Sequence, residues 1–450
     1  MSTKRKRIVI LGAGGRDFHN FNVAYRGDPR VEVIAFTATQ IPGIDARTYP
    51  SVIAGPLYPQ GIPIVPEETL PEIVRRQGVD EVVLAYSDLS SDAVMAKAAW
   101  VHSLGPDFSL LGPAATEIAS EKPVIAVLAV RTGCGKSQTS RRVTAILREQ
   151  GKRAVAVRHP MPYGDLARQG VQRFATIEDL ARHECTIEEM EEYEPHIVNG
   201  TICYAGVDYE AILREAEKEA DVVVWDGGNN DLSFYRPDLT ITVLDPHRAG
   251  DELRYYPGRT CFLTADVLVI NKIDSANPRA VDRVRRSIRE HNPRATVIDA
   301  ASPVRVDDPE AIRGKRVLVV EDGPTLTHGN MRYGAGVVAA RKWGAAEMID
   351  PRPYLVGALK ETFASYTGIG ALLPAVGYGA QQRRDLAATI ARVPCDTVIV
   401  ATPIDLRRVI DIAQPAVRVH YDLQEIGRPT LADALAEFLS RRSGVGTMAR

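Results

Sequence analysis

Hydrophobic residues along the chain gather in short continuous runs rich in Val, Ile and Leu, separated by polar stretches with helical spacing. Such runs are typical of strands that are buried on both faces of a parallel sheet. We expect strands at residues 7–11, 31–36, 81–85, 108–111, 124–130, 154–157, 220–226, 239–244, 267–270, 296–300, 316–320, 397–401 and 416–421. Helices are expected at residues 71–77, 92–102, 210–219, 278–291, 355–366, 381–392 and 430–439. This alternation predicts an α/β protein with doubly wound parallel sheets.

The strand expected at residues 124–130 leads into a loop of sequence TGCGKS and then into a helix that runs through Arg148. A phosphate-binding loop requires this order, because its backbone N–H groups and the helix N-terminus face a polyphosphate together. Lys136 would reach the β- and γ-phosphates, and the Ser137 hydroxyl would bind Mg²⁺. The pattern G-x-x-x-x-G-K-[ST] fails at its first position, where Val130 stands. The residues predicted to bind nucleotide in this loop are Thr132, Gly133, Cys134, Gly135, Lys136, Ser137 and Gln138.

Two later strands end in residues that suit the same site. The run 220–226 ends in Asp226, an acidic residue placed to hold Mg²⁺ directly or through water. The run 267–270 is followed by Asn271, Lys272 and Asp274, an N-K-x-D sequence whose lysine stem can cover a purine and whose aspartate can pair with guanine. Ligands of doubly wound sheets bind at the carboxyl ends of the strands, so these signals predict one nucleotide crevice.

The order of the elements divides the chain into three parts. Residues 1–120 predict a Rossmann-like N-terminal domain, residues 121–350 a P-loop NTPase domain, and residues 351–450 a C-terminal α/β segment that could extend the central sheet. In the first part, Asp17 stands where the last glycine of G-x-G-x-x-G belongs, so NAD binding is not expected.

Polar residues at the start of the first predicted helix are candidates for binding a second substrate. Arg16, His19 and Asn20 could hold a phosphate or carboxylate group, together with the helix N-terminus. Alternatively, Asp17 caps this helix, and Arg16 and His19 are surface groups.

A second loop, after the strand at residues 154–157, also contains candidates. Arg158, His159 and Tyr163 lie in a rigid proline-rich segment beside the expected crevice, where they could contact the second substrate. Alternatively, His159 is a loop histidine that bonds only to backbone. Further along, residues 186–194 (TIEEMEEYE) are expected to form a helix whose acidic face is solvated.

Composition narrows the class of protein. The 450 residues are 45% hydrophobic and 25% charged, with a net charge of −2, which is typical of globular domains and argues against a dedicated nucleic-acid binder. No apolar run approaches the roughly 20 residues that span a bilayer, and no signal peptide is evident, so we expect a cytoplasmic protein. We also expect a homo-oligomer, in the form of a dimer. The five cysteines are too scattered for a disulfide framework or a zinc site, and the positive loop could lower the thiol pKa of Cys134.

Five segments, in this order, resemble the cyclic 2,3-diphosphoglycerate synthetase family: ILGAGGRDFHNFN, VRTGCGKSQTS, RHPMPYGDLARQ, WDGGNND and LTHGNMRYGAG. The resemblance covers nearly the whole length, and the P-loop part is also similar to signal-recognition-type and dethiobiotin-synthetase-like NTPases. It implies an ATP-dependent ligase that closes an intramolecular phosphoanhydride in 2,3-diphosphoglycerate and releases ADP and phosphate. The resemblance favours ATP, whereas the N-K-x-D sequence alone suggests GTP.

The implied reaction gathers several negative charges, so the site must stabilise them with cations. Under this interpretation Lys136, Arg131 and Asp226 are catalytic, and Ser137 and Asp226 hold Mg²⁺. The residues that would bind the substrate are Arg16, His19, Asn20, Arg158, His159 and Tyr163. Two alternatives stay open: a regulatory or chaperone-type NTPase switch, and a ligase or kinase that acts on another phosphorylated or carboxylated acid.

Overall fold

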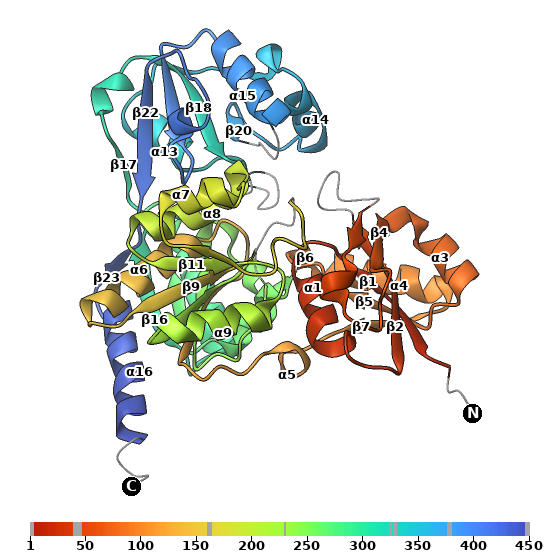
Figure 1. Ribbon diagram of the computed structural model, residues 1–450. Coiled ribbons are helices and arrows are strands. Elements are labelled where there is room, and N and C mark those ends of the chain that lie inside the picture. Colours follow the sequence, from red (N-terminus) through yellow and green to blue (C-terminus); the bar gives the residue numbers. More distant parts are fainter. Residues whose placement is uncertain are drawn as a thin grey trace.

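The computed structural model describes residues 4–38, 47–159, 164–228, 231–323, 326, 331–375 and 380–445, with only the backbone of 443–445. Three α/β units, each built on its own sheet, make up the molecule (Figure 1). In that view the red and orange N-terminal unit lies beside the central unit, and the blue upper unit packs on the central one. The predicted α/β class with parallel sheets is therefore confirmed.

The N-terminal unit contains a six-stranded sheet of order β3-β4-β2-β1-β5-β7, parallel except for the β3–β4 pair. An aromatic cluster that includes Phe18, Phe21, Phe36 and Tyr49 fills the core on one side of this sheet. The strands are β1 (Lys6–Leu11), β2 (Val31–Ala38), β3 (Thr48–Tyr49), β4 (Ile62–Pro66), β5 (Glu81–Leu84) and β7 (Asp107–Leu110). The helices are α1 (Arg16–Asn20), α2 (Ser51–Ala54), α3 (Leu70–Gln77), α4 (Ser91–Leu104) and α5 (Pro113–Thr116).

The central unit contains a nine-stranded sheet of order β10-β11-β9-β12-β8-β13-β15-β16-β23. Its inner pairs are parallel, and its two edge strands pair antiparallel with their neighbours. The strands are β8 (Val124–Ala129), β9 (Ala154–Arg158), β10 (Gln172–Phe174), β11 (Ile202–Ala205), β12 (Val222–Asp226), β13 (Leu239–Leu244), β15 (Val267–Ile270), β16 (Thr296–Ala301) and β23 (Gln424–Ile426). The helices are α6 (Lys136–Glu149), α7 (Ile177–Arg182), α8 (Ile187–Val198), α9 (Tyr209–Glu219), α10 (Gly258–Thr264), α11 (Pro278–His291) and α16 (Leu431–Val445).

The middle strand β8 explains why its sequence is a continuous apolar run. Ile125 and Val127 belong to the core on one face of the sheet, which includes side chains from α6, α11 and α16. Val124 and Ala126 belong to the core on the opposite face, beside Trp225 and side chains of α9. Because successive side chains of a strand point to opposite faces, both sets must be apolar when helices cover both faces.

The upper unit contains a third sheet, with β17, β22, β21, β18 and β19 in order and β20 also paired to β18. Its strands are β17 (Val304–Val306), β18 (Arg316–Asp322), β19 (Glu347–Met348), β20 (Leu373–Ala375), β21 (Thr397–Ala401) and β22 (Ala416–Tyr421). Its helices are α13 (Ala335–Lys342), α14 (Ala358–Ser365) and α15 (Ala380–Arg392). The chain thus leaves the central sheet after β16 and returns to it at β23. The sheets therefore divide the chain near residue 303, whereas the sequence suggested a boundary at 350, because an apolar run does not reveal which sheet it joins.

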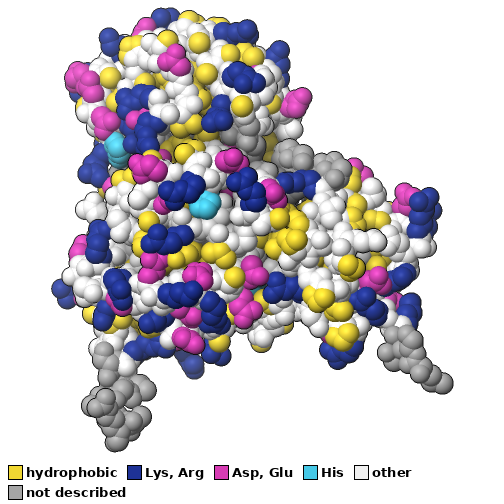
Figure 2. Space-filling view, viewed as in Figure 1, with side chains coloured by type: hydrophobic (Ala, Val, Ile, Leu, Met, Phe, Trp, Pro, Cys, Tyr) yellow, Lys and Arg dark blue, Asp and Glu magenta, His cyan; other side chains and the backbone are white. Residues whose placement is uncertain are grey.

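A short antiparallel pair connects the N-terminal and central units. β14 (Tyr255–Tyr256) of the central unit pairs with β6 (Leu89–Ser90) of the N-terminal unit. On the face shown in Figure 2, Lys and Arg side chains are interspersed with Asp and Glu, in keeping with the net charge of −2. Among the described helices, none combines the length and apolar character that crossing a membrane requires.

Candidate nucleotide and substrate site

The loop between β8 and α6 has the geometry of a phosphate-binding loop. Gly133 and Gly135 adopt φ angles of 80° and 109°, in the left-handed region that favours glycine. A Cβ atom at Gly135 would lie 2.1 Å from Nδ2 of Asn271, so only glycine fits there. Gly135 is the N-cap of α6 and no side chain caps this helix, so its first-turn N–H groups suit a bound anion. Val130, in place of the first motif glycine, is buried with its carbonyl against Gly258.

Lys136 lies in a buried cluster of charges behind this loop. Its Nζ atom is 2.6 Å from Oδ1 of Asp226, and the same oxygen is 2.9 Å from Nη1 of Arg158. Nε2 of His196 lies 2.9 Å from Oδ2, the other carboxylate oxygen. Arg158 also forms an ion pair with Glu192 of α8. A chain of ionic contacts therefore connects α8 to the phosphate loop.

The pKa values of this cluster follow from burial and from the neighbouring charges. Burial raises the pKa of Asp226, but Arg158, Lys136 and His196 outweigh it and hold that pKa well below its usual range. Burial, together with the charge of Arg158, lowers the pKa of Lys136 to about 8, although Asp226 opposes the shift. Burial also lowers the pKa of His196. The carboxylate is therefore ionised at neutral pH, and Lys136 is mostly protonated there.

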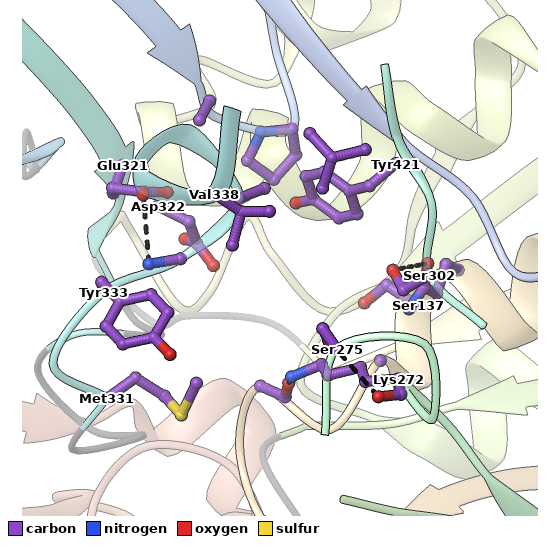
Figure 3. Close-up of a pocket in the computed structure, with 18 of the residues that line it drawn as sticks. Ser137, Lys272, Ser275, Ser302, Glu321, Asp322, Met331, Tyr333, Val338 and Tyr421 are labelled. Atoms are coloured by element: carbon purple, nitrogen blue, oxygen red, sulfur yellow. Dashed lines mark hydrogen bonds between the residues drawn. The ribbon is translucent and has the colours of Figure 1, made fainter. Parts of the chain in front are cut away.

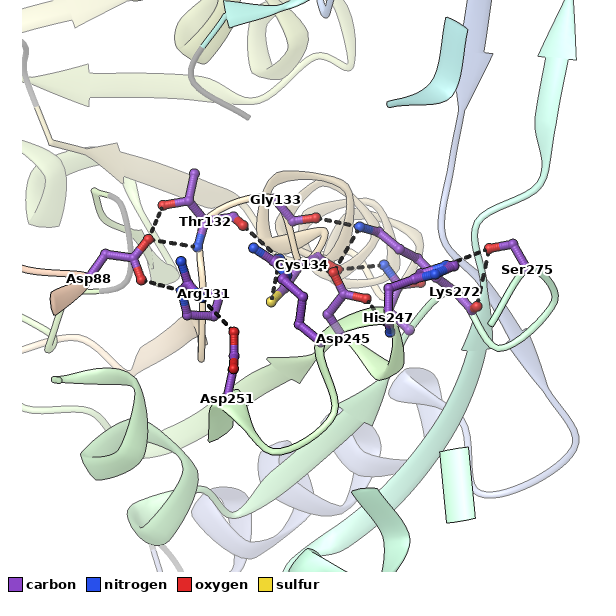
Figure 4. A network of polar contacts seen from close by, with 12 residues as sticks. Asp88, Arg131, Thr132, Gly133, Cys134, Asp245, His247, Asp251, Lys272 and Ser275 are labelled. Atoms are coloured by element: carbon purple, nitrogen blue, oxygen red, sulfur yellow. Dashed lines mark hydrogen bonds and ion pairs between the residues drawn. The ribbon is translucent and has the colours of Figure 1, made fainter. Parts of the chain in front are cut away.

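Asn271 and Lys272 of the N-K-x-D sequence bind carbonyls of the phosphate loop, and Figure 4 shows Lys272 beside Gly133. Nδ2 of Asn271 donates a hydrogen bond to the carbonyl of Cys134 at 2.9 Å. Nζ of Lys272 donates to the carbonyl of Gly133 at 2.5 Å and forms a 3.2 Å ion pair with Asp245. Asn271 and Lys272 therefore fix the loop backbone. The structure brings together the loop and the N-K-x-D sequence, as the motifs predict.

A cavity of about 870 Å³ extends from the phosphate loop to the upper unit. Figure 3 shows Ser137, Lys272 and Ser302 along one side of it and Glu321 and Asp322, at the end of β18, along the other. The predicted site residues that line this cavity are Arg131, Thr132, Gly133, Gly135, Lys136, Ser137, Gln138, Arg158, Lys272 and Asp274. Asp226, Asn271 and Cys134 are buried next to these residues and do not line it.

Helix α8 differs from its predicted environment. The acidic segment 186–194 was expected to present a solvated face, but Glu188, Glu189, Glu191 and Glu194 are all buried. α8 packs against α6 and the central sheet, and its Ile187 side chain joins the core of the upper unit. The prediction was wrong because the elements that cover α8 come from distant parts of the chain. As a result, Glu191 and Glu192 line the cavity.

The cavity lining also includes Glu321, Asp322 and Tyr421, which carried no recognisable motif; Glu191, Glu321 and Asp322 are here called the acidic wall. Glu321 accepts hydrogen bonds from the backbone N–H groups of Gly334 at 3.1 Å and Val337 at 3.0 Å, and thus caps helix α13. Burial raises its pKa to about 7. Asp322 and Tyr421 line the cavity beside it. The sequence shows that an apolar strand ends in Glu321 and Asp322. This pattern is equally typical of a ligand site and of a simple turn, so it does not identify a site by itself.

The candidates in α1 lie at the contact between two units and do not line this cavity. Arg16 forms a 3.2 Å ion pair with Asp231, and Nε2 of His19 lies 2.7 Å from the carbonyl of Thr116. The His19 ring stacks on Phe234 with centroids 3.9 Å apart, and Asn20 is also buried. These side chains are neither exposed nor gathered around the cavity. Their polar groups hold the N-terminal unit against the central one.

The Asp17 carboxylate accepts hydrogen bonds from the glycine-rich loop of the N-terminal unit. Its carboxylate accepts backbone N–H groups of Gly14 at 2.9 Å and Gly15 at 3.0 Å. Those N–H groups are the donors that a dinucleotide pyrophosphate would use in a Rossmann turn. The carboxylate thus takes the place of the phosphate, and the capping alternative for Asp17 fits the geometry.

His159 lies where the N-terminal and central units meet. A Cβ atom at Gly15 would fall 1.6 Å from its Nε2 atom, and one at Gly228 would fall 2.9 Å from its ring. Burial, with help from the charge of Arg158, lowers the pKa of His159 to about 3, so the ring is neutral at pH 7. Tyr163 lies outside the described residues.

Two nitrogens of the Arg131 guanidinium bind neighbouring carboxylates. Its Nε atom is 2.6 Å from Asp88 and its Nη1 atom is 2.5 Å from Asp251, while the guanidinium lies 3.5 Å from the ring centroid of Tyr255 (Figure 4). These contacts bind the phosphate loop to the N-terminal unit and support a positioning role, not the predicted contact with a transferred phosphoryl group. Burial raises the pKa of Cys134 to about 11, so the predicted lowering of that pKa was wrong.

The donor set near the loop suits a phosphate-bound cation. Among the described residues, no group of three His, Cys, Asp or Glu side chains could hold a metal ion by itself. Mg²⁺ in nucleotide sites takes most of its ligands from phosphates and water, so one hydroxyl suffices on the protein side. Ser137 supplies that hydroxyl at the cavity surface, next to Lys136.

Comparisons with known proteins give one near relative. A Thermococcus kodakarensis protein named arginine synthetase ArcE is 61% identical over 435 residues, which cover 97% of both chains. No family model matches the chain. Among solved structures, LpxK from Aquifex aeolicus in complex with ATP is 13% identical, with a TM-score of 0.42 over 72% of this chain and 90% of that one. A cobyrinic acid a,c-diamide synthase from Mycobacterium smegmatis with a bound ATP analogue and magnesium is 16% identical, with a TM-score of 0.19 over 40% and 72%.

Proposed function

The chain belongs to the family of the Thermococcus kodakarensis arginine synthetase, and we propose that it is an ATP-dependent ligase that forms arginine. One observation carries this proposal: a single cavity has a phosphate-binding loop on one side and the carboxylates of Glu191, Glu321 and Asp322 on the other. A ligase that makes an amino acid needs both environments, one for the triphosphate and one for a positively charged substrate. The resemblance to cyclic 2,3-diphosphoglycerate synthetases implies the same reaction class with a different substrate.

The chemistry of arginine defines the two other substrates. Its guanidinium carbon differs from the ureido carbon of citrulline by one nitrogen in place of oxygen. The nitrogen donor would be ammonia, because a donor that reacts through its α-amino group would leave its own carbon skeleton on the product. The ureido oxygen is a poor leaving group, so it must first be phosphorylated.

Two steps complete the proposed reaction. The ureido oxygen attacks the γ-phosphorus of ATP, the bond between the γ-phosphorus and the β,γ-bridging oxygen breaks, and ADP leaves. Ammonia then attacks the carbon, the C–O bond breaks, and inorganic phosphate leaves with its electron pair while the nitrogen loses a proton. The first step moves negative charge onto phosphoryl oxygens next to the loop.

The residues of the buried cluster suit this charge movement. Lys136 reaches from the loop, and Asp226 orients both Lys136 and Arg158 by ionic contacts of 2.6 and 2.9 Å. Cations held in advance at the developing charge cost no reorganisation during the reaction. Ser137 would hold Mg²⁺, which supplies Lewis-acid neutralisation of the phosphates when bound.

We favour ATP over GTP as the nucleotide. Of the N-K-x-D residues, Asn271 and Lys272 are occupied in fixing the loop backbone. Asp274 lines the cavity and accepts the backbone N–H of Ser302 at 3.1 Å, and it is the residue available for contact with a base. Competition between ATP and GTP for a fluorescent nucleotide analogue tests the choice.

A second candidate is the closure of cyclic 2,3-diphosphoglycerate. It is favoured by the cations in the cavity lining, among them Arg141, Arg341 and Lys342, which outnumber the carboxylates. A substrate with two phosphates would suit that excess of positive charge. The buried carboxylate of Glu191 on the same cavity disfavours a polyanion, so this substrate ranks second.

One experiment separates the two substrates. The protein is incubated with Mg²⁺ and ATP, either with citrulline and ammonium or with 2,3-diphosphoglycerate, and ADP, arginine and phosphorus NMR spectra are recorded. The proposal expects arginine and ADP in equal amounts in the first mixture and no cyclic phosphoanhydride in the second. The Lys136→Ala variant is the negative control, and the reverse pattern of products would support the second candidate.

A further inference from the structure

Glu191 is a buried carboxylate without a hydrogen-bonding partner. Only 6% of its surface is exposed, and neither Oε1 nor Oε2 has a partner among the described residues. It nevertheless borders the cavity, on the helix that also carries Glu192. A buried carboxylate with no donor loses its hydration without compensation, which disfavours its ionised form. A ligand that donates to this carboxylate would offset this loss.

Two further carboxylates act on Glu191 in the same direction as its burial. Burial is the largest cause of the raised pKa of Glu191. The charges of Asp322, at the end of β18, and of Glu188, on the same helix α8, raise this pKa further. Burial raises the pKa of the Tyr421 hydroxyl. The charges of Asp322, Glu191 and Glu321 raise it further, whereas the charge of Arg141 lowers it. These carboxylates come from two units of the fold and converge on one part of the cavity. Because burial and mutual repulsion disfavour the ionised form of these carboxylates, a cation bound beside them would stabilise that form.

We propose that Glu191, with Asp322 beside it, forms a subsite that binds the ammonium nitrogen of a substrate. The inference rests on the proposed function, because it assigns one of the substrates of arginine synthesis to the acidic wall. An ammonium group supplies several N–H donors and a positive charge, which satisfies both oxygens of a carboxylate at once. The ammonium belongs either to free ammonia in its protonated form or to the α-amino group of citrulline.

The position of this subsite suits the reaction. Glu192, the next residue of α8, is ion-paired to Arg158, and Arg158 contacts the Asp226 carboxylate that holds Lys136. Glu192 is thus connected through three successive ion pairs to the lysine of the phosphate loop. A nitrogen held by Glu191 would be kept in the same cavity as the phosphorylated substrate.

Steady-state kinetics of Glu191→Gln test the subsite and identify the source of the nitrogen. The substitution keeps the shape of the side chain and removes its charge. We expect the KM for one substrate, ammonium or citrulline, to rise at least about tenfold, while the KM for ATP changes less than about twofold. A rise for ammonium assigns the subsite to the nitrogen donor, and a rise for citrulline assigns it to the α-amino group. Asp322→Asn should raise the same KM.

Glu189→Gln provides the matched control. Glu189 lies on the same helix and is also buried, but its Oε2 atom accepts the N–H of Thr186 at 2.8 Å in the helix cap and it does not line the cavity. We expect both KM values of this variant to stay within about twofold of the wild type. Glu191→Asp, which keeps the charge, should recover part of the lost affinity. Unfolding midpoints of all four variants show whether each one is folded.

Two outcomes would overturn the subsite. Both KM values of Glu191→Gln could equal those of the wild type, or the change could be confined to the apparent affinity for Mg²⁺. If the wild-type protein makes no arginine, the proposed function fails by itself, and calorimetric titration with ammonium chloride and with citrulline decides about the subsite. Binding to the wild type that is lost in Glu191→Gln would support the subsite. Absence of binding to the wild type would rule the subsite out.

Discussion

The Nζ atom of Lys136 lies 2.6 Å from Oδ1 of Asp226, with both side chains shielded from solvent. The carboxylate also contacts Arg158 at 2.9 Å, and Arg158 has Glu192 as a second partner, so Asp226 is shared between two cations. A nucleotide phosphate that enters the loop brings further negative charge to the same cations. The stability of the free protein and its affinity for nucleotide therefore depend on a shared set of charges.

Replacing Asp226 with Asn should destabilise the free protein by about 3 kcal/mol, because Lys136 loses its counter-charge and Arg158 keeps only Glu192. Nucleotide phosphates can replace that charge, so ATP without Mg²⁺ should raise the unfolding midpoint more in the variant than in the wild type. Thermal unfolding with and without ATP measures both effects. Asp282→Asn, at a side chain that is 70% exposed, is the control and should leave the midpoint unchanged. Equal stabilisation by ATP in wild type and variant would contradict the shared-charge interpretation.

The pH dependence of the reaction should reflect Lys136. Its pKa of about 8 means that the free enzyme loses this positive charge as the pH rises through that value. Because kcat/KM reports the free enzyme, kcat/KM for ATP should fall above about pH 8. Asp226 stays ionised far into the acid range, so it should add no acid limb near neutral pH. A profile that stays flat from about pH 7 to about pH 10 would show that this lysine does not control the reaction.

Gly135→Ala should abolish nucleotide binding. Its φ angle is 109°, and a Cβ atom there would lie 2.1 Å from Nδ2 of Asn271, so the loop must shift. Gly151 is the matched control, because its φ angle of 72° is also left-handed and nothing lies within 4 Å of a Cβ atom at that position. Gly151→Ala should cost about 1 kcal/mol of stability and leave ATP affinity intact. Calorimetric titration with an ATP analogue compares the two variants, and equal affinities would contradict a tight loop.

The Arg131–Asp88 ion pair should couple the N-terminal unit to the phosphate loop. The Arg131 and Asp88 side chains are 6% and 9% exposed, and the ionic contact measures 2.6 Å. A double-mutant cycle of Arg131→Gln and Asp88→Asn should give a coupling energy of about 2 kcal/mol in unfolding experiments. Both single variants should also weaken ATP binding, because they release the residue that precedes Thr132. Arg153→Gln, which breaks an exposed ion pair with Asp221, is the control and should leave ATP binding unchanged. If the effects of Arg131→Gln and Asp88→Asn on the free energy of unfolding are additive, the two residues are not coupled.

The phosphate loop could be predicted because its information is local. A buried strand, two glycines, a lysine and a helix follow one another within residues 124–148, and the structure keeps that order. The N-K-x-D residues were also found in this way, although Asn271 and Lys272 serve the loop backbone. Local sequence cannot show which partner a polar side chain will meet. Arg16 pairs with Asp231 and the His19 ring stacks on Phe234, both far along the chain, so a cluster of donors at a helix start proved to be part of a contact between units.

The acidic wall could not be predicted for the same reason. Glu191 belongs to a segment whose composition is typical of a solvated helix, and its burial depends on elements that follow more than a hundred residues later. Nothing within α8 distinguishes Glu191 from its acidic neighbours. The cytoplasmic location and the dimer stay predictions.

The two crossings between the central sheet and the upper unit lie side by side. Ala301 of β16 pairs with Gln424 of β23, and Val304 of β17 pairs with Tyr421 of β22, so one two-stranded ribbon enters both sheets. A unit attached in this way cannot separate from the central unit while the ribbon is intact. Helix α8 of the central unit holds it as well, because the Ile187 side chain joins the core of the upper unit. Pro303 and Tyr421 border the cavity at the ribbon, so the strands that join the two sheets also form part of the cavity lining.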